Sequence, residues 1–408
     1  MKPTGLKKMS RFHWVFLGTL LIPCWIIGFK YFVDLKTIYK VAELAGTNPL
    51  AVYHDFDGDA GRFFYGPIFI WLVRPMAFVP QKFGTVVWLI PQTVSYFVFW
   101  ICLLKLIPGL FDSQKKGWWL LLFAFAINPI HNNFQSNNIQ LILCAMLMLG
   151  HVLMGRNTKL SQGLGASLVS LAAVIKIFPA FMWLYYFVTK PKQVKLFLVM
   201  SSLIVISFPL MIVGWDGTLE MYRGLISNVT TYQKDNSLVG VVDILCLPSM
   251  IARIATAVGI PDQTYSVVAK GIIVAISTCF FGLAYLRRNE REEYLVSLWA
   301  LGLALMAFLN PSTRVHYFIF YLPAFCAVVS DGTNGTAYSR RILTAGILSF
   351  VLVALTMEGV VGKSFNNTLE GLSVPTLGAA ILLLGLVQLL KKLGSHVPST
   401  TPTPSNWQ

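Results

Sequence analysis

The sequence consists largely of repeated apolar segments, many of them close to the length that a helix needs to cross a bilayer. A spanning helix takes roughly 17–25 residues. A backbone in lipid must satisfy its own hydrogen bonds, so such segments fold as helices. We predict an all-α polytopic membrane protein with about 12 transmembrane helices. The expected spans lie near residues 12–31, 85–106, 117–130, 137–155, 163–175, 177–189, 194–214, 264–286, 293–309, 315–331, 341–361 and 374–390.

Composition supports a membrane protein over a nucleic-acid-binding protein. Hydrophobic residues make up 56% of the chain, charged residues only 12%, and the mean hydropathy is +0.66. The net charge of +15 would suit a nucleic-acid partner. The basic residues, however, cluster between apolar segments, where membrane orientation explains them. We therefore expect the lipid bilayer as a partner and no nucleic acid.

The distribution of Lys and Arg predicts the topology. Lys and Arg concentrate at the N-terminus and in alternate connections, which places both termini in the cytoplasm. This assignment requires segments 63–80 and 240–257 to be amphipathic helices on the outer surface. Two large outer loops result, at about 32–84 and 215–263. We expect one membrane-embedded unit over 1–396 and a disordered cytoplasmic tail over 397–408.

Asp34 follows the first apolar segment immediately, in a chain that otherwise avoids charge. A carboxylate at a membrane boundary is partly desolvated, which raises its proton affinity and suits a general base. The alternative is a helix cap or a partner for Lys30 or Lys36. The other costly polar residues are predicted to lie at the same membrane face.

Lys176 interrupts an apolar stretch of about 25 residues, so its charge needs a cavity, a partner or an anion. A lipid phosphate would suit it, whereas snorkelling to the interface is the alternative. Arg314, His316 and Tyr317 enter a span from the outside. Arginine binds phosphate oxygens, and histidine donates to phosphate or carries a proton. An interfacial belt of Arg, His and Tyr is the alternative.

Two further polar runs lie on the predicted outer side. The run 128–138, Asn-Pro-Ile-His-Asn-Asn-Phe-Gln-Ser-Asn-Asn, offers amides for a polyhydroxylated ligand, or simply forms an interhelical turn. The run 54–59, His-Asp-Phe-Asp-Gly-Asp, has carboxylates for a hard cation. It lacks the rest of a calcium loop, which favours a solvated turn.

Short motifs in a fixed order make the chain similar to a known family between about 12 and 330. They include Phe64-Tyr65-Gly66-Pro67, Ser136-Asn137-Asn138-Ile139-Gln140, Lys176-Ile177-Phe178-Pro179, Asn236-Ser237-Leu238 and Arg314-Val315-His316-Tyr317, after Asp34 and Tyr39. The chain resembles the GT-C membrane glycosyltransferases, most closely family 87, the polyprenol-phosphate-mannose-dependent transferases. It departs in having Ser-Asn-Asn for the common Gly-Gln-x-Asn, and Tyr-Gly-Pro for Tyr-Pro-Pro.

The resemblance implies a GT-C-like bundle and an inverting transfer of a sugar, mannose above others, from a polyprenyl-phosphate donor. Asp34 would be the catalytic base toward a hydroxyl of a glycolipid or glycan acceptor. Lys176, Arg314 and His316 would bind the donor phosphate. No cofactor is required, and a divalent cation stays open. The implied substrate-binding residues are Tyr39, Tyr65, Asn137, Asn138, Gln140, Asn236, Ser237 and Tyr317.

The predicted location is a bacterial inner (plasma) membrane, with the active site on the extracytoplasmic side. Two other classes remain as alternatives. A lipid-linked sugar transporter or flippase would show polar residues near the bilayer midplane and inverted repeats. A GT-C-like ligase would use a lipid-diphosphate donor, which suits several arginines in outer loops.

Overall fold

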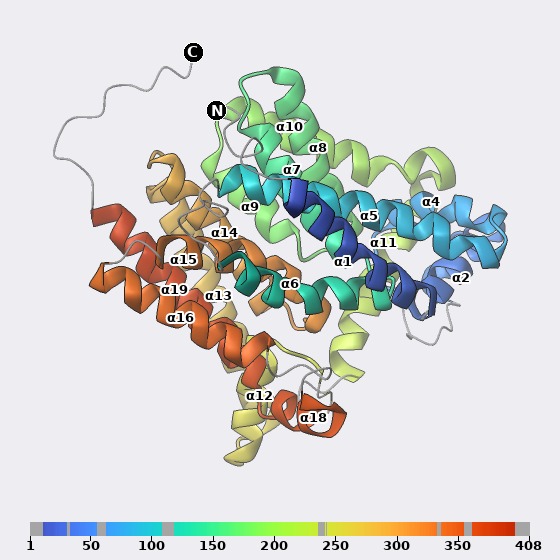
Figure 1. The fold of residues 1–408 in the computed structure, drawn as a ribbon. Helices are drawn as coiled ribbons and strands as arrows, with labels where there is room; N and C mark the ends of the chain where they lie inside the picture. The colour runs from blue at the N-terminus through green and yellow to red at the C-terminus, as the bar shows by residue number, and fades with distance from the viewer. Residues whose placement is uncertain are drawn as a thin grey trace.

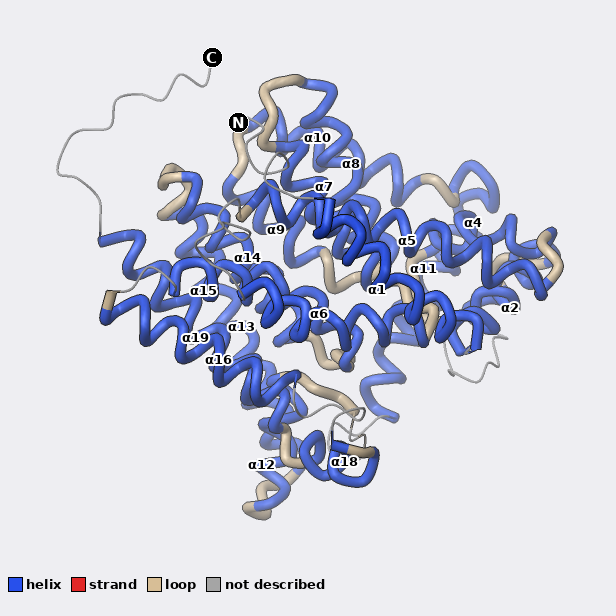
Figure 2. The backbone as a smooth tube through the Cα atoms, in the orientation of Figure 1, coloured by secondary structure: helices blue, strands red, loops and turns tan. Residues whose placement is uncertain are grey.

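The computed structural model describes residues 11–30, 33–54, 63–107, 118–235, 241, 243–332, 336–354 and 361–395. Throughout these residues the regular structure is helical and no strand occurs (Figures 1 and 2). The predicted all-α class is therefore confirmed. The aspartates of the 54–59 run, Asn236, Ser237 and the tail 397–408 lie outside the described residues.

The helices fall into three groups along the chain. The first group is α1 (Arg11–Lys30), α2 (Val33–Thr47), α3 (Ala51–His54), α4 (Pro67–Val73), the 3₁₀ helix η2 (Arg74–Phe78) and α5 (Gln81–Leu106). The second is α6 (Trp118–Gln135), α7 (Gln140–Met154), α8 (Lys159–Ile175), α9 (Ala180–Thr189), α10 (Lys192–Ser207) and α11 (Leu210–Asp235). The third is α12 (Leu247–Ala257), α13 (Asp262–Leu286), α14 (Glu292–Leu309), the 3₁₀ helix η4 (Val315–Tyr321), α15 (Leu322–Gly332), α16 (Ala337–Ala354), α18 (Lys363–Gly371) and α19 (Val374–Ser395).

Several helices are long and apolar enough to cross a membrane. Within the described residues these are four, α5, α13, α14 and α19, or up to six if the bent pairs α1–α2 and α10–α11 each form one span. This count is consistent with a multi-pass membrane protein. The larger number of about twelve spans stays a prediction. Three of the expected spans coincide with α7, α8 and α9, whose 15, 17 and 10 residues are few for crossing a bilayer.

The core of the bundle is formed around α14. In the 18-residue apolar stretch of α14, 78% of the residues are buried. In the corresponding stretch of α13 only 17% are buried, so α13 lies at the periphery. Along the C-terminal side, α16 and α19 pack against each other (Figure 1). The apolar face of α13 is therefore the natural one to meet lipid, whereas α14 is enclosed by protein.

One predicted span is interrupted. The sequence predicts a continuous segment over 194–214, but α10 ends at Ser207 and α11 begins at Leu210, bent by 83°. Pro209 lies in the break. Proline interrupts a helix because it removes a backbone donor and clashes with the preceding turn. Gly214 bends the chain again with φ 70°, a left-handed conformation that glycine adopts readily.

The first predicted outer loop, 32–84, is mostly helical rather than irregular. Asp34 therefore begins a helix instead of lying in a loop. Helix α2 buries one face at helical spacing and exposes charges on the other, so it is a boundary helix rather than a span. Its buried residues are Leu35, Ile38, Tyr39, Val41, Ala42 and Ala45.

Two more predictions concern segments 63–80 and 131–136, which were both expected on the outer side. Segment 63–80 forms α4 and η2, together about 18 Å long, too short for a bilayer core of about 30 Å. The predicted outer turn at 131–136 is wrong, because α6 continues to Gln135. Its polar side chains are thus presented from a helix, and only residues 136–139 form the turn.

Candidate active site

Asp34 lies at the start of α2 and is held from the α6–α7 turn. Its backbone N–H donates to the carbonyl of Ser136 at 3.2 Å. Its Oδ2 accepts a hydrogen bond from Asn138 Nδ2 at 2.7 Å. A negative charge in the first turn of a helix is also favourable. Asn138, predicted to bind substrate, therefore contacts the predicted base directly.

Lys176 lies between α8 and α9, where the backbone turns extended and ends α8. Three aromatic rings surround its ammonium group: the distances from Nζ to the ring centroids are 5.0 Å for Tyr65, 5.2 Å for Tyr317 and 5.9 Å for Phe178. Contacts at these distances stabilise a cation through the ring quadrupole. The ammonium group thus lies among aromatic rings of the protein, and its charge acts on Asp34.

Tyr65 reaches Lys176 because the chain beside it docks tightly on the α8–α9 bend. The N–H of Gly66 donates to Ile175 O at 2.8 Å, and a Cβ at Gly66 would overlap the carbonyl oxygen of Val174. Glycine is therefore required at this position. The ring of Tyr65 stacks on Phe69 at 4.5 Å.

The segment before and within η4 supplies Arg314 and His316. Asn133 Nδ2 donates to His316 O at 2.9 Å, and Asn133 Oδ1 accepts from Leu141 N at 3.0 Å. One buried amide thereby joins α6, α7 and η4. The His316 ring lies 4.9 Å from that of Tyr317, between centroids. Arg314 Nε pairs with Asp243 Oδ2 at 3.4 Å.

The charges of this cluster influence one another. Burial raises the pKa of Asp34 above its ordinary value, while the charge of Lys176, the hydrogen bond from Asn138 and the charge of Arg314 lower it in part. Burial alone would lower the pKa of Lys176, but Tyr317, Tyr65 and Asp34 outweigh it, and the net pKa is raised. Burial raises the pKa of Tyr65 to about 12, so its phenol stays neutral.

The structure thus brings together most of the predicted site. Asp34, Asn138, Lys176 and Arg314 interact across α2, the α6–α7 turn, the α8–α9 bend and the start of η4. The rings of Tyr65 and Tyr317 lie beside the ammonium group of Lys176 and stabilise it. His316 lies next to Tyr317, and the charges of Lys176 and Arg314 both reach it.

Other predicted residues take structural positions. Tyr39 is buried, and its hydroxyl donates to Val79 O at 3.0 Å. Asn137 adopts φ 53°, a left-handed conformation that Asn tolerates and Gly favours, and its carbonyl accepts from Trp88. Gln140 is fully buried, and within the described residues its side-chain amide has no hydrogen-bond partner.

Two contributors were not predicted as site residues. Asn133 lies in the amide-rich run, but nothing in the run distinguishes it from its neighbours. Asp243 belongs to the segment predicted as a surface helix, and only the fold brings it to Arg314. Both contacts join segments more than 70 residues apart, so a local pattern could not reveal them.

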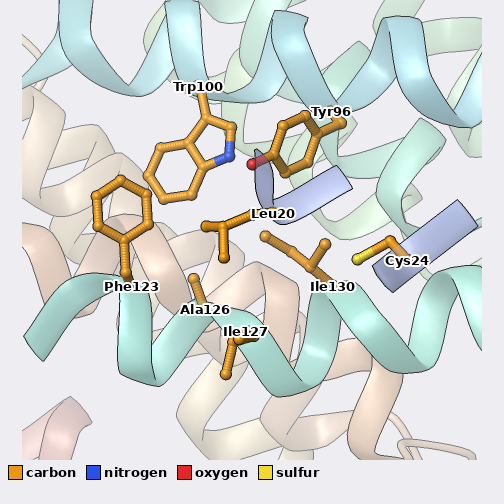
Figure 3. Close-up of a pocket in the computed structure, with 8 residues that line it drawn as sticks. All are labelled: Leu20, Cys24, Tyr96, Trp100, Phe123, Ala126, Ile127 and Ile130. Atoms are coloured by element: carbon orange, nitrogen blue, oxygen red, sulfur yellow. The ribbon is translucent and has the colours of Figure 1, made fainter. Parts of the chain in front are cut away.

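No metal cluster competes with this site in the described part of the chain. There, no group of three or more His, Cys, Asp or Glu side chains is placed to hold a metal ion. A cavity of about 10 Å³ lies among apolar side chains of α1, α5 and α6, including Leu20, Trp100 and Phe123 (Figure 3). With no charged group in its lining, it has no evident chemistry.

A cluster of charged and aromatic side chains in a helical bundle with several membrane-length helices is consistent with a multi-pass membrane protein. The model of glycosyltransferase family 87 matches residues 63–311, more than half of the chain. The chain belongs to this family, and the predicted resemblance is confirmed. No curated protein and no solved structure matches the chain. Asn138 and Lys176 fall within the matched range, while Asp34 and Arg314 lie outside it.

Proposed function

We propose that this glycosyltransferase moves a sugar, mannose by resemblance, from a polyprenyl phosphate to a hydroxyl of a glycolipid or glycan. The observation that supports this best is the placement of Asp34. The charges of Lys176 and Arg314 both act on its carboxylate, while Asn138 donates a hydrogen bond to one of its oxygens. A base beside fixed positive charge is what a displacement with an anionic leaving group needs.

The reaction is a single inverting displacement. Asp34 takes the proton of the acceptor hydroxyl, and that oxygen forms a bond to the anomeric carbon. The bond from this carbon to the phosphate oxygen breaks, and the polyprenyl phosphate leaves with the electron pair. Lys176 and Arg314 stabilise the negative charge that develops on the phosphate. One carboxylate suffices, because a phosphate needs little acid assistance to leave.

The aromatic surroundings of Lys176 support its role. Tyr65, Tyr317 and Phe178 surround the ammonium group, and its raised pKa keeps it charged. A charge with little water around it interacts more strongly with a phosphate. In this proposal Lys and Arg side chains supply the positive charge at the phosphate, and no step uses a metal ion.

The proposal includes the membrane location. The Lys and Arg distribution supports a GT-C-like bundle of about 12 helices in a bacterial inner membrane, with both termini cytoplasmic. The site would then lie on the extracytoplasmic face. A lipid-linked donor reaches such a site from within the bilayer, which agrees with the position of Asp34 at the boundary between α1 and α2.

Donor class is the decisive test. Purified protein is incubated with a host lipid extract and radiolabelled polyprenyl-phosphate mannose, or with the matching diphosphate-linked sugar. We expect labelled product from the monophosphate donor alone. Product from the diphosphate alone would favour the ligase. Sugar-dependent lipid flux in proteoliposomes without any transfer would favour a transporter instead.

A further inference from the structure

The short segment from Asp243 to Cys246, just before α12, brings a second carboxylate to the site. Asp243 lies in this segment, and its Oδ2 is 3.4 Å from Arg314 Nε. Arg314 also acts on Asp34, lowering its pKa. The guanidinium group proposed to bind the donor phosphate therefore already carries an anionic partner.

The position of this segment does not depend on the ion pair. On one side, Leu245 N–H donates to Thr313 O at 2.7 Å, next to Arg314 in the chain. On the other side, two α12 side chains bind the carbonyl of Ile244: Arg253 Nη2 at 3.1 Å and Ser249 Oγ at 2.8 Å. Asp243 is thus presented to Arg314 from a fixed backbone.

The pair itself is open and weak. The side chains of Arg314 and Asp243 are 42% and 47% exposed, and the contact uses only Nε of the guanidinium group. Exposed ion pairs contribute little to stability, because water and salt screen them. A phosphate brings more oxygens and fits an arginine in a bidentate manner, so it competes well for the same group.

We propose that Asp243 is the resident counter-ion of Arg314, which a lipid-linked phosphate displaces on binding. After transfer, the carboxylate pairs with Arg314 again and helps to release the polyprenyl phosphate. This inference rests on the proposed function and adds a residue that sets donor affinity and product release. It assigns Asp243 no proton transfer.

The test uses citronellyl phosphate, a short polyprenyl phosphate, as a probe for the full-length protein in detergent. Asp243→Asn removes the competing charge but keeps the shape of the side chain. We expect it to bind the probe about three- to fivefold more tightly than wild type, the range that an exposed ion pair allows. In the transfer assay KM for the donor should fall, and kcat should not rise because release is slower.

The matched control is Asp216→Asn, which makes the same change in net charge at an exposed position of α11. It should leave probe affinity unchanged. Equal or weaker binding by Asp243→Asn, beside a wild type that binds, would overturn the counter-ion role alone. A wild type that does not bind citronellyl phosphate would instead overturn the donor class, and the counter-ion role with it.

Discussion

Two carboxylates in this molecule show what distinguishes a stabilising ion pair from a reactive group. At the C-terminal end, Asp331 receives Lys392 Nζ on both oxygens, at 2.7 and 2.9 Å. Lys392 also donates to Ser339. At the other site, Asp34 has one side-chain donor, Asn138, and within the described residues no direct ion pair. Its cations act from a distance.

The difference lies in how fully each carboxylate is satisfied. The Asp331–Lys392 pair is only 14–17% exposed and joins α15 to α19, so its charges are already neutralised. Asp34 keeps an oxygen that no described side chain occupies, and burial raises its pKa. A partly satisfied carboxylate in low dielectric has a reason to accept a proton, whereas a fully paired one does not.

The largest effect on stability should come from the satisfied pair. Lys392→Met leaves the Asp331 charge without its main partner, which costs about 3 kcal/mol, the lower end for a buried pair because some exposure remains. We expect a clear loss in thermal unfolding temperature with unchanged specific activity of the folded protein. The double variant Lys392→Met with Asp331→Leu should recover part of this loss. A severe loss of transfer in a folded Lys392→Met protein would contradict the comparison.

A smaller but more local effect is expected at Gly66. An alanine there would collide with Val174 O. The shift that relieves this collision would move Tyr65 away from Lys176 and cost about 1–3 kcal/mol of folding stability. Transfer should fall along with stability. Gly163→Ala is the matched control, since nothing lies within 4 Å of a Cβ at that position of α8. Thermal unfolding and transfer of both variants check the expectation, and equal behaviour would refute the tight docking.

The finest test concerns the amide that holds Asp34. Because Asp34 must be ionised to act as a base, activity is lost as the pH falls through its raised pKa. Asn138→Ala removes a hydrogen bond that lowers this pKa, so the acid limb of kcat/KM should move to higher pH. Asn138→Gln should restore part of the shift.

The control for this profile is Asn132→Ala, because among the described residues the Asn132 amide donates within its own helix, to Asn128. Its acid limb should coincide with that of wild type. If the acid limb of Asn138→Ala coincided with that of wild type, the Asn138 amide would not act on the group that titrates.

Much of this site was predictable, because placing charged side chains in a membrane costs free energy and such residues are rare there. Asp34, Lys176 and Arg314 stand out in an apolar chain, and the helical class follows from segment length. The sequence missed α2 as a helix, because charges on its exposed face conceal the buried stripe of Leu35 and Ile38.

Contacts between distant segments were beyond prediction. Nothing local indicates that Asn133 would bind the backbone of His316, or that Asp243 would reach Arg314. Tyr39, predicted to bind substrate, also has a distant partner, since its buried hydroxyl donates to a carbonyl 40 residues away. These partners depend on the packing of helices, which one sequence does not specify by pattern.

The central claim is that Asp34 accepts the proton. The most direct measurement is transfer from radiolabelled polyprenyl-phosphate mannose by wild type, Asp34→Asn and Asp331→Asn, compared at equal amounts of folded protein. We expect Asp34→Asn to lose about 10²- to 10⁴-fold in kcat with its unfolding temperature kept, since that is the usual contribution of a general base. Asp331→Asn should be less stable yet active. Full activity in Asp34→Asn would contradict the account.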